Sequence, residues 1–119
     1  MKDRIEDFQK TKDFLICVDS DGCAMDTMDV KHKEAFGPEA VKTWGLHSIQ
    51  DRFLEVWNDI NLYTKTRGIN RFKGVVTTFE ALEKEGIDMP DISSFKKWTE
   101  TTNELSAPSL EREIEKTND

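Results

Sequence analysis

Hydrophobic residues form one uninterrupted run near the start of the chain and recur at wider spacing after it. The run consists of Phe14, Leu15, Ile16, Cys17 and Val18, and polar residues bound it on both sides. A short apolar run between polar residues is typical of a buried β-strand. The sequence therefore predicts a strand at about residues 14–18.

From Met28 onward the apolar residues recur with a helical period, so the sequence predicts helices through the rest of the chain. Gly37 and Pro38 are expected to break the first helix, and Pro38 is expected to begin the next, because proline is favoured in the first turn. The expected helices cover Pro38 to Trp44, residues 48–65, Phe72 to Gly86, a stripe containing Phe95, Trp98 and Leu105, and a last charged segment that Ser109 caps after a break at Ala107 and Pro108.

The three tryptophans, Trp44, Trp57 and Trp98, fall on the apolar faces of these expected helices. This position favours packing in a core over a platform for a ligand. Apolar helix faces that lack a partner would also favour self-association or exchange of a strand with another copy of the chain.

Two carboxylates follow the apolar run directly. Asp19 and Asp21 are one residue apart, and a strand holds residues at this spacing on the same side. Ligand sites in open α/β sheets lie beyond the carboxyl ends of strands. A calcium-binding EF-hand loop is excluded, because counting from Asp19 its sixth position is Ala24 instead of glycine and its twelfth is Val30 instead of glutamate.

An apolar strand followed by Asp-x-Asp-Gly at residues 19–22, with Asp26 and Thr27 shortly after, resembles the first motif of the haloacid dehalogenase-like (HAD) hydrolase superfamily. The resemblance implies that Asp19 is the nucleophile that accepts a phosphoryl group and that Asp21 is the general acid/base. It also implies Mg²⁺, bound by the Asp19 carboxylate and the backbone carbonyl of Asp21. Carboxylates are competent nucleophiles, and a hard cation with oxygen ligands neutralises phosphate charge.

The same resemblance implies a parent fold of the α/β class. This chain would supply residues 1–27 as the first strand and motif of the core, and residues 28–119 as an incomplete helical cap domain. The later motifs of the family, a Ser or Thr after a second strand, a Lys and an acidic pair, are not found in a convincing context. A single strand also needs neighbours for its backbone groups. We therefore expect the N-terminal portion of a larger enzyme, whose partner is the remainder of the HAD core or a second copy of the chain.

The start of the expected cap resembles that of beta-phosphoglucomutase-like and phosphonatase-like members of the superfamily. Asp26 and Thr27 are followed by His32 and then by Ala35 and Phe36. The interval from Asp26 to His32 is one residue longer than in that pattern. His32 is therefore a candidate for a hinge or for substrate binding, with a histidine on the helix surface as the alternative.

One segment is basic in an otherwise acidic chain. Residues 60–79 contain Lys65, Arg67, Arg71 and Lys73 and no acidic residue, whereas the whole chain carries a net charge of -7. Arginine suits bidentate contacts with phosphate. Arg67, Asn70 and Arg71 are therefore candidates for binding a small phosphorylated substrate. The alternative is a solvated loop whose arginines pair with nearby Asp and Glu.

Length and charge restrict the remaining possibilities. A chain of 119 residues suggests one domain at most, and its acidic balance argues against nucleic acid or an anionic membrane as a partner. No stretch resembles a signal peptide or approaches a membrane span, and the two cysteines suggest a reducing, cytoplasmic setting. The leading hypothesis is part of a Mg²⁺-dependent HAD-like phosphatase or phosphotransferase. The alternative is a non-catalytic helical interaction or regulatory module that retains the Asp-x-Asp motif.

Overall fold

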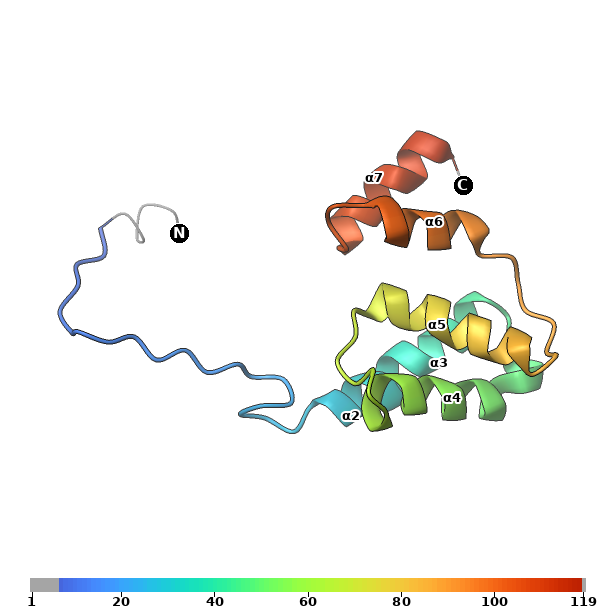
Figure 1. Ribbon diagram of the computed structural model, residues 1–119, viewed down its shortest axis with the longest axis horizontal. Coiled ribbons are helices and arrows are strands. Elements are labelled where there is room, and N and C mark those ends of the chain that lie inside the picture. Colours follow the sequence, from blue (N-terminus) through green and yellow to red (C-terminus); the bar gives the residue numbers. More distant parts are fainter. Residues whose placement is uncertain (1–6, 119) are drawn as a thin grey trace.

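The structure is a computed structural model that describes residues 7–118 (Figure 1). These residues form α-helices joined by short π-helical and 3₁₀ turns, and the only β-type contact among them is an isolated bridge between Asp21 and Met25. The elements are α2 (Met28–Val30), η1 (Lys31–Phe36), α3 (Gly37–Thr43), η2 (His47–Ile49), α4 (Gln50–Asn58), η3 (Asp59–Tyr63), α5 (Arg71–Lys84), α6 (Ser93–Thr101) and α7 (Ala107–Thr117).

The predicted strand at residues 14–18 is wrong, and so is the α/β fold class for this chain. The segment is extended but pairs with no other part of the described chain, and Phe14, Leu15 and Ile16 are each at least 85% exposed. Figure 1 shows it running away from the helices. An apolar run becomes a strand only where a neighbouring strand accepts its backbone hydrogen bonds, and residues 7–118 contain no such neighbour.

The core lies where α3, α4 and α5 pack together. Phe53 and Trp57 of α4 and Phe79 and Leu82 of α5 are at most 1% exposed, and Val41 of α3 joins them. These residues recur at three- and four-residue intervals, which places them on one face of each helix. The helical pattern read from the sequence is therefore confirmed for α4 and α5.

The expected break at Gly37 and Pro38 is wrong, because helical backbone runs on from Met28 to Thr43. The turn before Pro38 is π-helical, with the Gly37 N–H donating to the His32 carbonyl five residues earlier. This wider turn accommodates a proline that lacks an N–H and would crowd a regular helix. Gly37 is needed for packing, since a Cβ there would lie 2.8 Å from Leu54 Cδ2 and 2.9 Å from the His32 carbonyl oxygen.

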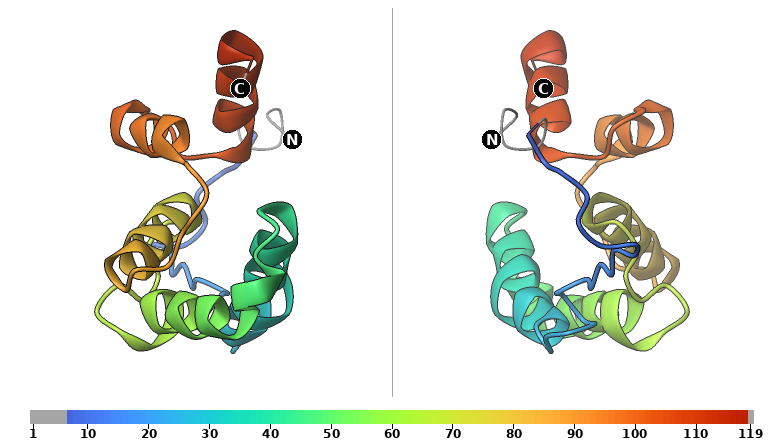
Figure 2. Two further views of the ribbon diagram at one scale, coloured as in Figure 1. Left: turned by 90° about the vertical axis from the view of Figure 1, so that its right-hand side faces the viewer. Right: turned by 90° about the vertical axis from the view of Figure 1, so that its left-hand side faces the viewer.

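Two of the remaining elements form a pair at one end of the molecule. Figure 2 shows α6, in orange, near α5, and α7, in red, next to α6, with both away from the turn that precedes α2. The expected break between the last two helices lies at residues 102–106 and not at Ala107 and Pro108, which begin α7. Ser106, not Ser109, is the N-cap of α7, with Ser106 Oγ accepting from the Ser109 N–H at 3.3 Å. Proline is tolerated there because the first turn leaves its N–H groups unpaired.

Aromatic contacts join α6 to the rest of the core. The Phe72 ring of α5 meets the Trp98 ring of α6 edge to face at 5.3 Å between centroids, and Phe95 lies 6.5 Å from Trp44. Such pairs add to the stabilisation from burial by about 0.5–1.5 kcal/mol each. Within residues 7–118, no helix combines the length and the apolar character needed to cross a membrane.

Candidate functional site

The Asp-x-Asp motif lies in a compact hydrogen-bonded turn that precedes α2. The Ala24 N–H donates to the Asp19 carbonyl at 3.1 Å, the Met25 N–H to the Ser20 carbonyl at 2.8 Å, and the Gly22 N–H to the Met25 carbonyl at 2.8 Å. Gly22 has a φ of +70°, and a Cβ there would lie 2.7 Å from Met28 Cγ. The turn therefore needs glycine at this position on two counts.

Asp19 and Asp21 share this turn but have different surroundings. Asp19 is exposed, and its Oδ1 accepts a hydrogen bond from the neighbouring Ser20 N–H at 3.0 Å. Asp21 is held by side chains: Oδ1 accepts from Thr27 Oγ1 at 2.7 Å and Oδ2 from Lys31 Nζ at 2.6 Å. The hydrogen bond from Lys31, followed by that from Thr27, lowers the pKa of Asp21 below its usual value. Asp21 is therefore a carboxylate at neutral pH.

Lys31 is a site residue that the sequence did not reveal. It lies ten residues after Asp21, and the pairing depends on the turn bringing the chain back toward η1. Thr27 occupies the N-cap position of α2, yet its hydroxyl makes no capping hydrogen bond and donates to Asp21 instead. A threonine before a helix was the available signal for this arrangement, although that pattern ordinarily indicates a cap.

His32 lies inside the helical core. It is 5% exposed and contacts the rings of Phe36 and Trp57, at centroid distances of 5.3 and 5.8 Å. Desolvation by burial, with smaller contributions from the charges of Lys31 and Arg67, lowers its pKa. The surface alternative for His32 is wrong, and its Nδ1 is buried without a hydrogen-bond partner among the described residues.

The basic segment does not gather around one point. Arg67 donates from Nη1 to the Leu62 carbonyl at 2.8 Å and lies 3.9 Å from Asp29 Oδ1, near the start of the helical region. Asn70 is the N-cap of α5, with Oδ1 accepting from the Phe72 N–H at 2.9 Å. The Arg71 guanidinium lies over the Phe72 ring at 4.7 Å. Asn70 thus has a structural role, while Arg67 and Arg71 have different neighbours.

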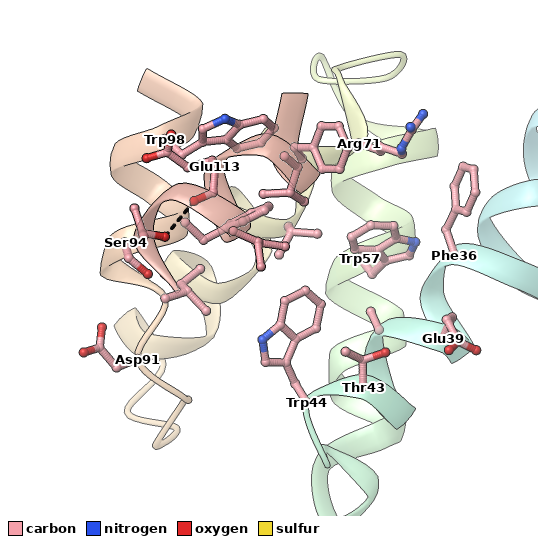
Figure 3. A pocket seen from close by; sticks show the side chains of 18 residues that line it. Phe36, Glu39, Thr43, Trp44, Trp57, Arg71, Asp91, Ser94, Trp98 and Glu113 are labelled. Atoms are coloured by element: carbon pink, nitrogen blue, oxygen red, sulfur yellow. Dashed lines mark hydrogen bonds between the residues drawn. The ribbon is translucent and has the colours of Figure 1, made fainter. Parts of the chain in front are cut away.

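A groove of about 790 Å³ opens between α3, α4 and α5 on one side and α6 and α7 on the other (Figure 3). Most of its wall is apolar. Trp44 and Trp98 line this wall and also pack against neighbouring aromatic rings. Burial in the core is confirmed for Trp57 and Trp98, which are 1% and 5% exposed. The aromatic and charged residues of the groove are Phe36, Trp44, Trp57, Phe72, Phe95, Trp98, Glu39, Arg71, Asp91 and Glu113.

The turn offers few ligands for a metal ion. No group of three or more His, Cys, Asp or Glu side chains suited to a metal occurs within residues 7–118. The carboxylate of Asp21 is already paired with Lys31. The exposed Asp19 carboxylate and the backbone carbonyl of Asp21 could contribute two oxygen ligands, which fits Mg²⁺ because this ion commonly keeps several waters and takes few protein ligands.

Comparisons of this chain with protein-family models, with curated proteins and with solved structures find no match.

Proposed function

We propose that this chain is part of a HAD-like phosphatase or phosphotransferase in which Asp19 forms an aspartyl-phosphate with a small phosphorylated metabolite. The observation that carries the proposal is the contrast between the two carboxylates of one turn. Asp19 is exposed and has no cationic partner among the described residues, while Lys31 and Thr27 hold Asp21. An unpaired carboxylate can attack phosphorus, and a second one in the same turn can handle the proton.

The reaction has two displacements. A carboxylate oxygen of Asp19 attacks phosphorus, the bond from phosphorus to the leaving oxygen breaks, and that oxygen takes a proton from the general acid. Water then attacks the same phosphorus, its proton passes to the base, and the bond between phosphate and Asp19 breaks. Asp21 is ionised and can therefore accept a proton in the second displacement, although its lowered pKa makes it a weaker base. Its acid role in the first requires Lys31 to leave Asp21 when substrate enters.

Mg²⁺ would be held by the Asp19 carboxylate and the Asp21 carbonyl. When bound, it would neutralise negative charge on the phosphate. The remaining ligands and the later motifs would come from the remainder of a HAD core as partner. The proposal concerns the chemistry of the turn and does not require a strand at residues 14–18.

The helices after the turn would form the cap that excludes water from the reaction. Arg67 is the candidate for binding the substrate's phosphate or another acidic group. Its guanidinium lies near Asp29, which is among the first helical residues after the turn. Its contact with Asp29 is long, at 3.9 Å, so little attraction opposes a move of the side chain toward a substrate.

A phosphoryl-trapping experiment tests the nucleophile. The chain, joined to the remainder of the core that the proposal requires, is incubated with Mg²⁺ and acetyl phosphate, quenched in acid, and analysed by mass spectrometry for an adduct that hydroxylamine removes. We expect the adduct on Asp19 and its loss in Asp19→Asn. Asp26→Asn, which changes an exposed carboxylate just after the same turn, is the matched control and should keep the adduct. Absence of any adduct, or an adduct that persists in Asp19→Asn, would reject the proposal.

The apolar groove favours a second candidate, a non-catalytic interaction or regulatory module. Aromatic residues concentrated in a groove provide the anchoring contacts that dominate many interfaces. The two candidates differ in their response to Asp19→Asn. A module that binds through the groove would keep its binding in this variant and would show no phosphoryl adduct in the unmodified chain.

A further inference from the structure

Two apolar surfaces have no partner among residues 7–118, and we compare their sizes and charges. The first is the extended segment 14–18, in which Phe14, Leu15 and Ile16 are 90%, 86% and 85% exposed. The second is the groove between α3–α5 and α6–α7. Contiguous exposed apolar residues on this scale mark an interaction site. We infer that the groove binds segment 14–18 of a second copy of this chain, so that two copies exchange their N-terminal segments.

The size of the segment fits the groove. Five extended residues span roughly 16 Å and present alternate side chains to opposite sides. Phe14, Ile16 and Val18 therefore form one apolar row that can face the aromatic wall. A volume of about 790 Å³ lies in the range of about 300–1,000 Å³ over which protein clefts enclose most of a ligand's surface.

The charges that precede the segment complement those of the groove. Lys10 and Lys12 precede the apolar row, with one acidic residue, Asp13, beside them. The groove is lined by three carboxylates, those of Glu39, Asp91 and Glu113, and by one cation, Arg71 (Figure 3). Complementary charges favour one partner over others and set its orientation. The segment would therefore lie with Lys10 and Lys12 toward the carboxylates of the groove.

The occupant comes from another copy because the turn directs the segment away from its own groove. The contacts of Asp21 with Thr27 and Lys31, together with the backbone bonds of the turn, hold the chain where it leaves α2. Figure 1 shows segment 14–18 extending away from the helices from that point. Reciprocal exchange then closes a dimer, in which each copy gives one segment and receives one.

The oligomeric state of the full chain and of surface variants tests this inference. Analytical ultracentrifugation over a concentration series should show a dimer. Ile16→Asn in the segment and Ile114→Asn on the lip of the groove should each raise the dimer dissociation constant by about tenfold or more. Val30→Asn is the matched control, because Val30 is 52% exposed and lies outside both surfaces, whereas Ile114 is 46% exposed. It should leave the constant unchanged.

A cross-linking experiment distinguishes exchange from folding back. Cys17 and Cys23 are both exposed and free, so a thiol-directed benzophenone can be placed on Cys17 in a Cys23→Ser background. Chains of natural isotope composition (light chains) that carry the benzophenone are mixed with isotope-enriched (heavy) chains before irradiation. We expect cross-links from a light chain to α6, α7 or α5 of a heavy chain.

Three results would overturn the inference. The first is a chain that stays monomeric at every concentration, even if its groove binds a small apolar dye. The second is a dimer that neither Ile16→Asn nor Ile114→Asn weakens. The third is a set of cross-links that lie only within one chain. Ile16→Asn changes an exposed residue outside the helical core, so its effect does not depend on how well the helices fold.

Discussion

Lys31 Nζ lies 2.6 Å from Oδ2 of Asp21, and this contact joins the turn that carries the candidate nucleophile to the first helical residues. Thr27 adds a second donor to the same carboxylate at 2.7 Å. The ion pair between Lys31 and Asp21 distinguishes Asp21 from Asp19, although both are aspartates of the same turn. The pKa of Asp21 is a quantity by which this contact can be measured.

Removing the lysine should raise the pKa of Asp21. Because its pKa in the folded chain is lowered from 3.8, the folded state binds fewer protons than the unfolded state in acid. The contribution of Asp21 to stability is therefore present above about pH 4 and is lost as the pH falls through the folded pKa. Carboxyl carbon NMR titration should show a higher pKa for Asp21 in Lys31→Met than in the unmodified chain.

Lys33→Met is the control for this titration, because Lys33 pairs with Asp29 at 3.3 Å instead of with Asp21. Lys33→Met should leave the pKa of Asp21 unchanged. Equal Asp21 curves in the unmodified chain and in Lys31→Met would show that the ion pair does not form in solution.

His32 should make the fold sensitive to mild acid. Its folded pKa is lowered from 6.5, mainly by burial, so the folded state binds fewer protons than the unfolded state. Stability from the neutral ring is present above the unfolded pKa and falls as the pH drops below about 6.5. Urea unfolding at pH 8 and pH 5.5 should show a loss in acid that is smaller in His32→Gln.

The exposed His47 provides the comparison for this measurement, since its replacement removes a histidine without opening the core. His47→Gln should keep the acid-dependent loss of the unmodified chain. A loss that is the same size in His32→Gln would assign the pH dependence to other groups.

Asn70 should act on stability and not through a ligand. Its Oδ1 accepts from the Phe72 N–H at 2.9 Å at the start of α5. Asn70→Ala should lower the free energy of unfolding by about 1 kcal/mol, because the cap is lost, whereas Asn70→Ser should retain most of it. Urea unfolding followed by circular dichroism measures both, and equal stability of the two variants would contradict the capping role.

Gly74 should not tolerate a side chain. Alanine usually stabilises a helix relative to glycine by about 1 kcal/mol, but a Cβ on Gly74 would lie 2.6 Å from Asn61 Oδ1 in the buried contact of α5 with η3. Gly74→Ala should therefore destabilise the chain by about 1–3 kcal/mol, in the range of an overpacked core.

A double-mutant cycle checks the cause of that loss. Asn61→Ala removes the side-chain oxygen nearest to the added methyl group. In this background Gly74→Ala should cost less, which gives a coupling free energy of about 0.5 kcal/mol or more. Additive effects would place the cause elsewhere in the helix.

The helices could be predicted because their signal is local. Phe53 and Trp57, or Val75, Phe79 and Leu82, mark one face of a helix without reference to the rest of the chain, and these faces are buried. The ends of the helices were harder to predict. Gly37 with Pro38 and Ala107 with Pro108 predict breaks between helices, yet Pro38 follows a π-helical turn within continuous helical backbone, and Pro108 lies in a first turn, where its missing N–H has no cost.

The candidate site could be predicted only as a set of chemical groups. Asp19 and Asp21 were marked by their spacing, and Arg67, Asn70 and Arg71 by their type. The structure places Asn70 in a cap and His32 in the core, and it brings in Lys31, whose distance from Asp21 in the sequence gave no indication of contact. Residue type sets what a side chain can do, but its neighbours set its protonation and its partners.

By itself, the sequence determined the helical character of residues 28–118 and the presence of two carboxylates next to a glycine that the turn requires. Both properties follow from the local chain, through side-chain periodicity and backbone conformation. Only the tertiary structure decided that residues 14–18 pair with no strand among the described residues, that Asp21 and not Asp19 meets a lysine, and that the aromatic residues leave a groove. These depend on contacts between segments far apart in the chain, because a strand, an ion pair or a groove wall exists only where a partner is brought to it.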